Sequence, residues 1–137
     1  MATVKNFGIL EGIDWNSHNW QYHSSEEDIK KSKFGYVTEN SKTHTSLNFG
    51  HDIYPADEKG YYPGLLPHLW SRGLDRDNSK FVCCIFMKSR NYKDGNIYII
   101  GMYAFPEFIK SSRKSPIAGD DFIFQSNVFY KSVTIVN

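Results

Sequence analysis

The sequence predicts an α+β fold, namely a small curved sheet or open β-barrel with one or two flanking helices. Three observations support this prediction. Two apolar runs rich in strand formers, 81–87 and 96–105, are separated by a polar segment that ends in Asp94-Gly95, which is the pattern of a β-hairpin. Shorter strand-like segments occur before and after this hairpin. Only two segments carry the signals of a helix.

The other predicted strands are short apolar segments bounded by polar residues, glycine or proline. They cover residues 4–10, 34–38, 47–49, 122–125 and 133–136. Three polar segments between the predicted elements are expected to be loops. These are residues 14–23, residues 50–63 and the basic stretch 110–116. The last predicted strand runs to the end of the sequence, so we expect the chain to be a fragment of a longer protein.

Both predicted helices are short. Ser24, followed three positions later by Glu27, gives a capping-box pattern that predicts a helix from there to about Lys33. The second helix is predicted from apolar residues at helical spacing, with Pro67 in its first turn and Gly73 as its C-terminal stop. Its apolar positions are Leu65, Leu66, Leu69 and Trp70.

Composition restricts the class of protein. The 137 residues suit one domain, and we expect a single domain over residues 1–137. An aromatic content of 16% is too high for a disordered chain. With 16 basic and 15 acidic residues the net charge is +1, so any basic surface must come from local segregation of charge.

The two cysteines bear on the cellular compartment. Cys83 and Cys84 are adjacent in an apolar run, where cysteine acts as a small hydrophobic side chain. Such a pair cannot crosslink distant segments, and we infer a reducing compartment. The sequence shows neither a signal-peptide pattern nor an apolar run long enough to span a bilayer. We therefore expect a cytoplasmic protein.

Catalytic and metal-binding motifs give little support for an enzyme. There is no Gly-rich phosphate loop, no Gly-x-Ser-x-Gly elbow, and no histidine or cysteine pair with zinc spacing. His51 lies near Asp52, Asp57 and Glu58, which leaves a small hydrolase open as a third hypothesis, although a solvated loop explains the same residues. We expect a binding module without metal or cofactor, and not an enzyme.

An unusual group of aromatic residues lies in one polar loop. Trp15, Trp20 and Tyr22 are flanked there by asparagine and glutamine. Flat rings of this kind can stack on a nucleobase or a methylated group, and polar side chains nearby can read the edge of a base. The same rings can instead cover the hydrophobic core, and this alternative stays open. The candidate base-binding residues are Trp15, Trp20, Tyr22, Ser24, Tyr36, Asn48 and Trp70.

Basic residues gather in segments predicted to be loops, which suits contacts to phosphate groups. They follow the second predicted helix, occupy the hairpin loop, and lie in the stretch 110–116. Ordinary solubilising charge explains each of these groups equally well when it is taken alone. The candidate phosphate-binding residues are Arg72, Arg76, Lys88, Arg90, Lys93, Arg113 and Lys114.

Parts of the sequence resemble YTH domains. Residues 25–37, Ser-Glu-Glu-Asp-Ile-Lys-Lys-Ser-Lys-Phe-Gly-Tyr-Val, are similar to the first helix and the following strand of those domains. Residues 81–87 and 97–104 are similar to the central YTH hairpin. The related EVE domains and the N-terminal modified-DNA readers of some McrB-type restriction systems share this sheet. All of them belong to the PUA-like group of small barrels.

The resemblance implies a flipped methylated base held in an aromatic cage. Tyr36 stands near the position of one cage tryptophan of YTH domains. No tryptophan follows the hairpin, where those domains carry a second one. The resemblance therefore leaves that wall of the cage to Phe105, Phe108 or a tryptophan from another loop.

Together, these observations predict a nucleic-acid-binding domain that recognises a methylated base by base flipping. We expect DNA rather than RNA as the partner, and no membrane association. The expected role is the recognition module of a modification-dependent restriction system, fused to or assembled with a motor or nuclease. The alternative is a protein–protein interaction domain that uses the exposed aromatic loop.

Overall fold

The computed structural model describes residues 6–33, 48–51, 55–64, 66, 76–114, 123–130 and 132–135. Within these ranges, 76–77, 109–114 and the last two segments are described by their backbone alone. The elements in chain order are β1 (Phe7–Gly12), α1 (Glu26–Lys31), β2 (Tyr62–Gly64), α3 (Arg76–Ser79), β3 (Val82–Arg90), β4 (Ile97–Ala104), β5 (Glu107–Lys114), β6 (Ile123–Tyr130) and β7 (Ser132–Ile135).

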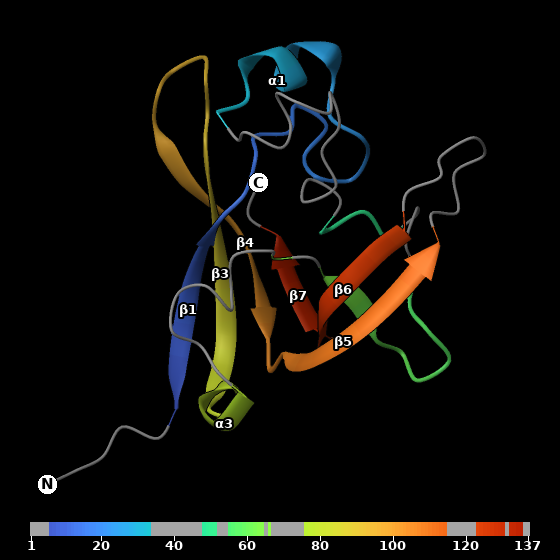
Figure 1. Ribbon diagram of the computed structural model, residues 1–137. Helices are drawn as coiled ribbons and strands as arrows, with labels where there is room; N and C mark the ends of the chain where they lie inside the picture. Colours follow the sequence, from blue (N-terminus) through green and yellow to red (C-terminus); the bar gives the residue numbers. More distant parts are fainter. Residues whose placement is uncertain are drawn as a thin grey trace, which may run out of the picture.

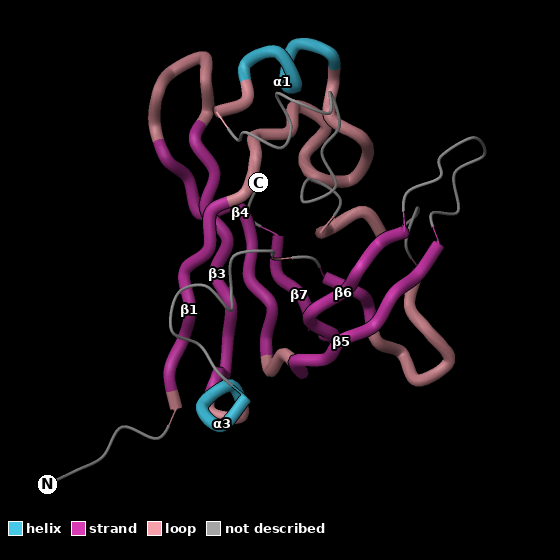
Figure 2. The backbone as a smooth tube through the Cα atoms, viewed as in Figure 1, coloured by secondary structure: helices cyan, strands magenta, loops and turns pink. Residues whose placement is uncertain are grey.

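The strands form two sheets (Figures 1 and 2). The first has the order β1-β3-β4-β7 and is mixed, because β1 runs parallel to β3 while the other neighbours are antiparallel. The second has the order β2-β6-β5 and is antiparallel. In Figure 1, β5 curves away from the end of β4, and α1 lies beyond the end of the first sheet, on the side of the β3–β4 loop. The described strands do not close into a barrel.

The predicted combination of β-sheet structure with a short helix is therefore confirmed. The predicted hairpin forms the centre of the first sheet, where β3 and β4 pair antiparallel. β3 is longer than predicted and continues through Ser89 to Arg90, with Ser89 buried and Arg90 exposed. The connecting loop is correspondingly shorter. It contains the predicted Asp94-Gly95 pair, with Gly95 at a φ of +75° that glycine adopts without strain.

The predicted capping box forms one residue further along the chain. Ser25 is the N-cap of α1: its side chain accepts a hydrogen bond from Asp28 N at 3.1 Å, and Asp28 Oδ2 accepts one from Ser25 N at 3.0 Å. The predicted pairing of Ser24 with Glu27 is therefore wrong. The physical reason is that Asp28 also accepts hydrogen bonds from Ser17, a tertiary contact that selects this register over the alternative.

Two predictions of local structure are corrected by tertiary pairing. The stretch 110–116 is predicted as a loop, but residues up to Lys114 belong to β5 and pair with β6. The neighbouring strand overrides the low strand propensity of lysine and serine here. Conversely, Asn48 and Phe49 are predicted in a strand but lie in a turn. The hydroxyl proton of Tyr103 is shared between two acceptors of Asn48, its carbonyl oxygen at 3.0 Å and its Oδ1 at 2.7 Å, which anchors that turn.

Other differences concern elements at the edges of the predicted pattern. The sequence does not predict β2 or α3. It misses β2 because Pro63 and Gly64 are typical of a loop. β2 is the edge strand of its sheet, where proline is tolerated. The predicted loop 14–23 contains only turns, bends and irregular backbone, as expected. The predicted strand 34–38 and the predicted helix around 65–73 lie outside the described residues, apart from Leu66.

The hydrophobic core fills the inner face of the first sheet. Ile85, Met87 and Tyr103 are fully buried there. Phe49 packs edge-on against Tyr103, with 5.6 Å between ring centroids and an interplanar angle of 71°. The Phe49 ring lies directly over Gly101 of β4, where a Cβ atom would be 2.9 Å from both Cε atoms of the ring and closer still to Cζ. Gly101 is thus required by the close approach of an aromatic ring to the strand backbone.

We predict that Gly101→Ala destabilises the protein by about 1–3 kcal/mol, because the added methyl group overpacks the contact with Phe49. Urea unfolding monitored by tryptophan fluorescence measures this change. Gly12→Ala is the matched control, since the nearest atom to its added Cβ is Lys88 Cε at 3.9 Å. Equal stability of the two variants would contradict the assigned packing of Phe49 on β4.

Candidate binding site

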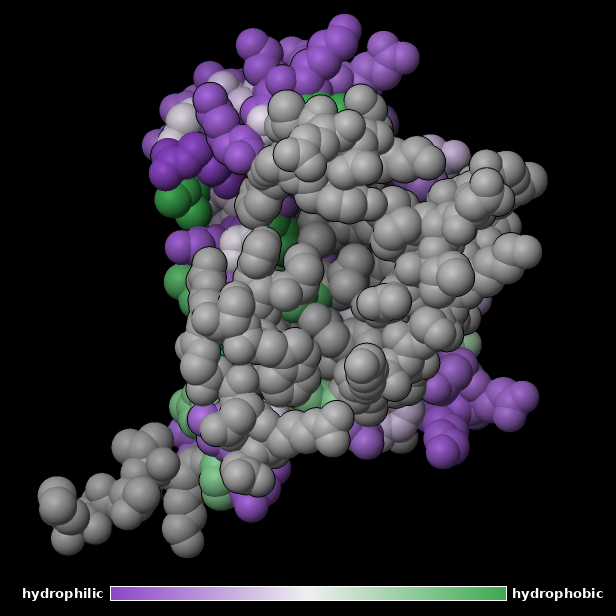
Figure 3. Space-filling view, viewed as in Figure 1, coloured by the Kyte–Doolittle hydropathy of each residue, from purple (hydrophilic) through white to green (hydrophobic). Residues whose placement is uncertain are grey.

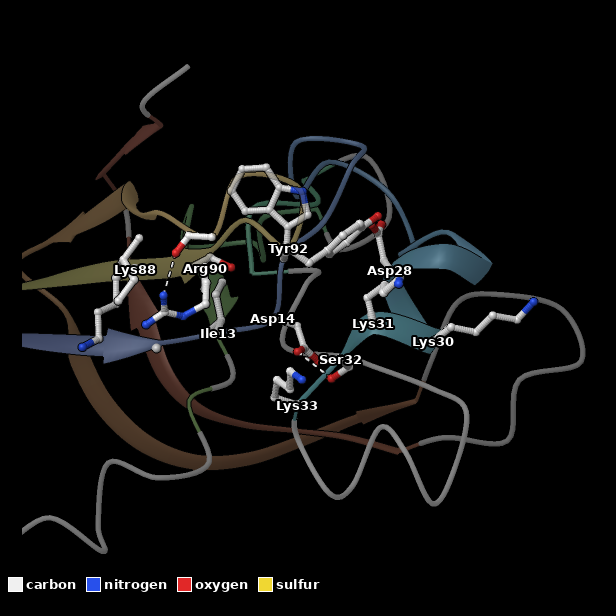
Figure 4. Close-up of a pocket in the computed structure, with 15 residues that line it drawn as sticks. Ile13, Asp14, Asp28, Lys30, Lys31, Ser32, Lys33, Lys88, Arg90 and Tyr92 are labelled. Carbon is white, nitrogen blue, oxygen red and sulfur yellow. Dashed lines mark hydrogen bonds between the residues drawn. The ribbon is translucent and has the colours of Figure 1, made fainter.

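A cavity of about 610 Å³ lies where three segments meet: the chain that leaves β1, the helix α1, and the end of the β3–β4 hairpin (Figure 4). In Figure 4, Asp14 lies between Lys88 and Arg90 of β3 on one side and Asp28 and Lys31 of α1 on the other. The cavity is therefore built by segments that are distant in the sequence.

The chain leaving β1 is fixed by the strand beside it. The Ile13 N–H donates to the carbonyl oxygen of Lys88 at 2.9 Å, which extends the contact between β1 and β3. Trp15 follows and is half-buried, with its ring edge-on to Trp20 at 5.2 Å between centroids and tilted against Tyr98 at 6.0 Å. These contacts hold the Trp15 ring at the cavity wall.

The Asp28 carboxylate joins all three segments. It accepts hydrogen bonds from Ser17 N at 2.9 Å, Ser17 Oγ at 2.8 Å, Ser25 N at 3.0 Å and the Tyr92 hydroxyl at 2.7 Å. Burial acts to raise the pKa of Asp28, but the hydrogen bonds from Ser17, Tyr92 and Ser25 outweigh it and hold this pKa below its usual range. Burial and the adjacent Asp28 carboxylate raise the pKa of Tyr92 to about 12, so its phenol keeps the proton that it donates.

The second carboxylate at the cavity also takes part in a structural contact. Asp14 is buried, and its Oδ1 accepts a hydrogen bond from Ser32 Oγ at 2.8 Å, just beyond the end of α1. Its backbone carbonyl accepts a hydrogen bond from Trp20 Nε1 at 2.9 Å. Asp14 and Asp28 are thus both engaged in holding the walls of the cavity together.

Cations outnumber carboxylates around the cavity. Among the described residues, five basic side chains line it, against two acidic ones. They are Lys30, Lys31, Lys33, Lys88 and Arg90. Arg90 Nη1 donates to the carbonyl oxygen of Gly95 at 2.6 Å, while Lys30 extends away from the cavity in Figure 4. In the space-filling view, the described surface at the α1 end of the molecule is mostly hydrophilic (Figure 3). The site therefore has a positive rim that suits an anionic ligand.

The predicted base-binding residues are dispersed by the fold. Trp15 lines the cavity, whereas Trp20 is only 4% exposed and belongs to the core. Trp20 has a φ of +57°, unusual for a bulky residue, and the burial of its ring together with its hydrogen bond to Asp14 stabilises this conformation. Tyr22 is 60% exposed and lies beside His23 rather than at the cavity.

The remaining predicted residues divide in the same way. Ser24 accepts a hydrogen bond from Asn16 Nδ2 at 3.3 Å and, like the buried Asn48, does not line the cavity. Among the predicted phosphate-binding residues, Lys88 and Arg90 line it, and Lys93 is exposed nearby in the hairpin loop. Arg76, Arg113 and Lys114 are described by their backbone alone, whereas Tyr36, Trp70 and Arg72 lie outside the described residues.

Several cavity residues are not predicted from the sequence. Asp14, Asp28, Ser89 and Tyr92 come from separate segments of the chain, and no local motif connects them. The basic cluster after Ile29 does carry a usable signal, because three lysines within four residues at a helix end are expected to form a local positive patch. Its position opposite Lys88 depends on the tertiary fold.

The residues of the hydrolase hypothesis have other contacts. The His51 ring stacks on Tyr62, with 3.9 Å between centroids and an interplanar angle of 15°. Asp57 Oδ1 accepts hydrogen bonds from Lys59 N and Tyr61 N, both at 2.9 Å, and so shapes a turn. Among the described residues there is no group of three histidine, cysteine or acidic side chains that could hold a metal ion. These contacts give no support for a catalytic role of His51.

The cysteines are half-buried side chains of β3. Cys83 Sγ donates to the carbonyl oxygen of Phe7 at 3.5 Å. Burial, together with the neighbouring Cys83, raises the pKa of the Cys84 thiol, which favours the protonated form over a reactive thiolate. The contacts of the cysteines are thus those of side chains that pack between β1 and β3.

Comparisons of the chain with protein-family models, with curated proteins and with solved structures give no match. In the part of the chain that the structure describes, no helix has the length and hydropathy required to cross a membrane. The candidate site therefore has to be interpreted from its own geometry and charge.

We predict that Asp28→Asn lowers stability at neutral pH by about 1–3 kcal/mol, because the amide cannot accept all the hydrogen bonds of the carboxylate. Since the pKa of Asp28 is lowered on folding, its contribution is complete above the ordinary value of 3.8 and is lost as the pH falls through the lower folded-state pKa. Thermal unfolding of wild type and variant from pH 7 downward should show the stability difference narrowing below about pH 4.

Tyr92→Phe is the graded control, because it removes one of the hydrogen bonds to Asp28 and keeps the carboxylate. We expect a smaller loss of stability in this variant than in Asp28→Asn. A stability difference between wild type and Asp28→Asn that stays constant over the whole pH range would contradict the role assigned to the charged carboxylate.

Proposed function

We propose that this chain is a nucleic-acid-binding domain of the PUA-like, YTH/EVE type, which takes a flipped methylated base into the cavity between α1 and the β3–β4 hairpin. The observation that carries the proposal is the combination of a positive rim with a fixed aromatic wall in one cavity. We further propose DNA as the favoured partner. The domain acts as the recognition part of a modification-dependent restriction system, with any catalysis in an attached motor or nuclease.

The size and lining of the cavity support a small aromatic ligand. Its volume of about 610 Å³ falls within the range of roughly 300–1,000 Å³ that is usual for ligand pockets. Trp15 offers a flat ring, and Ile13 and Ile97 offer apolar contact. Stacking contributes about 1–3 kcal/mol per base and offsets part of the few kcal/mol that base flipping costs. Burial of one methyl group adds about 0.8 kcal/mol.

The arrangement of the cations supports a ligand that carries phosphates. Lys88 and Arg90 approach the cavity from β3, while Lys31 and Lys33 lie at the α1 side. A nucleotide in the cavity would have its flanking phosphates within the field of both groups. Such contacts fix the position of a nucleic acid without reading its sequence, which leaves discrimination to the groups inside the cavity.

The alternative function, a protein–protein interaction domain that uses an exposed aromatic loop, has less support. It depends on an exposed aromatic loop, but Trp20 is buried and Trp15 is half-buried against it. In the described part of that loop, the large side chain that is highly exposed is Tyr22. We therefore treat binding of a protein partner as the outcome that follows if nucleic-acid binding fails.

The first experiment tests the positive rim. The probes are short single- and double-stranded DNA and RNA, each with and without N6-methyladenine or 5-methylcytosine, at about 50 and about 200 mM salt. The double variant Lys88→Ala with Arg90→Ala should weaken binding and reduce the slope of log affinity against log salt by about 2 on duplex DNA. Lys59→Ala with Lys80→Ala is the charge-matched control, because both exposed lysines lie in turns away from the cavity. Wild type without affinity for any probe would overturn the proposal.

A second experiment tests the aromatic wall. Trp15→Leu keeps an apolar side chain against Trp20 but removes the flat ring, so we expect a loss of at least about tenfold in affinity for the preferred methylated probe. Tyr22→Leu removes an exposed ring of the same loop that does not line the cavity and should bind like wild type. If Tyr22→Leu lost affinity and Trp15→Leu retained it, the base would have to bind elsewhere on the domain.

A further inference from the structure

In the part of the chain that the structure describes, the hydroxyl of Ser89 lines the cavity without making a hydrogen bond to the protein. Ser89 is only 2% exposed and lines the cavity from β3. Its Oγ is buried and has no hydrogen-bond partner among the described residues. Both carboxylates of the same cavity, by contrast, accept hydrogen bonds from protein groups.

A buried hydroxyl without a partner is unfavourable, because it loses its hydrogen bonds to water and gains none in return. An apolar residue of similar size would fill the position equally well and would suit a buried strand better. Packing therefore does not explain the hydroxyl. A hydrogen bond to a ligand that enters the cavity and shifts the atoms covering Oγ would explain it.

The position of Ser89 within β3 indicates which part of the ligand it meets. Successive side chains of a strand point to opposite faces, and the burial of β3 alternates accordingly: Ser89 is buried, while Lys88 is half-buried and Arg90 is exposed. The Ser89 side chain thus lies on the opposite face of β3 from the two cations of its own strand. Phosphates held by those cations and a base reaching the hydroxyl would occupy different parts of the cavity.

We propose that Ser89 is a specificity-determining residue, whose hydroxyl forms a hydrogen bond with the polar edge of the bound base. This inference rests on the proposed function and deepens it. A hydroxyl both donates and accepts, so it can pair with a ring nitrogen, an exocyclic amino group or a carbonyl oxygen of the base. It distinguishes a base from an apolar group of the same shape.

The test combines one substitution with one change in the probe. Binding of wild type and Ser89→Ala is measured with the preferred methylated oligonucleotide and with the same oligonucleotide carrying an abasic site at the methylated position. We expect Ser89→Ala to bind the first probe about five- to tenfold more weakly than wild type, and both proteins to bind the abasic probe equally. Ser89→Cys, which is slightly larger and is a weak hydrogen-bonding group, should also lose affinity.

Thermal unfolding of the free protein supplies a readout that separates this role from a structural one. Ser89→Ala should unfold at the same temperature as wild type or at a higher one, since no protein hydrogen bond is lost and a buried polar group is removed. Ser17→Ala is the contrasting control. Its hydroxyl donates to Asp28 at 2.8 Å, so its removal should lower the unfolding temperature.

Each adverse outcome has a distinct meaning. Equal binding of the methylated probe by wild type and Ser89→Ala would overturn the role of Ser89 and leave the proposed function standing. An equal loss on the methylated and the abasic probes would assign the contact to the sugar–phosphate backbone and overturn base reading. A lowered unfolding temperature of Ser89→Ala would show a structural role instead. If wild type bound neither probe, both the function and this inference would fail.

Discussion

The Asp28 carboxylate is the contact on which the geometry of the candidate site depends. A buried charge is tolerated only when its hydrogen bonds are satisfied, and here the donors come from the loop after β1, the N-cap of α1 and the hairpin. The helix α1 has six residues and is too short to be stable by itself in water. The same carboxylate that caps it also attaches it to Ser17 and Tyr92. One side chain thus makes contact with all three walls of the cavity.

The charge of the cavity follows from this use of its acidic residues. Asp14 and Asp28 are directed into hydrogen bonds between the walls, whereas the lysines of the rim are exposed or half-buried. A chain with a net charge of only +1 in this way presents a local positive surface around an aromatic and aliphatic interior. Local segregation of charge, and not composition, produces the positive rim of the cavity.

The sequence predicts those parts of the fold that are determined by residues close together in the chain. The hairpin is predicted because two apolar runs flank Asp94-Gly95, whereas the register of the capping box depends on donors 11 and 64 residues away in the sequence. The stretch 110–116 has a loop-like composition and becomes a strand because β6 lies beside it. Within the site, Lys88 and Arg90 are predicted from their charge. The inward direction of Ser89 and the burial of Trp20 are properties of the tertiary structure.

The parallel pairing of β1 with β3 has a consequence for the order of folding. β3 and β4 are neighbours in sequence and can associate early, whereas Phe7 of β1 finds its partner only at Val82. Contacts between such distant segments require the closure of a long loop and therefore form slowly. The chain that leaves β1 supplies one wall of the cavity, so a partly folded hairpin has no binding site. Any ligand of the cavity consequently binds the fully folded chain and stabilises the whole domain by mass action.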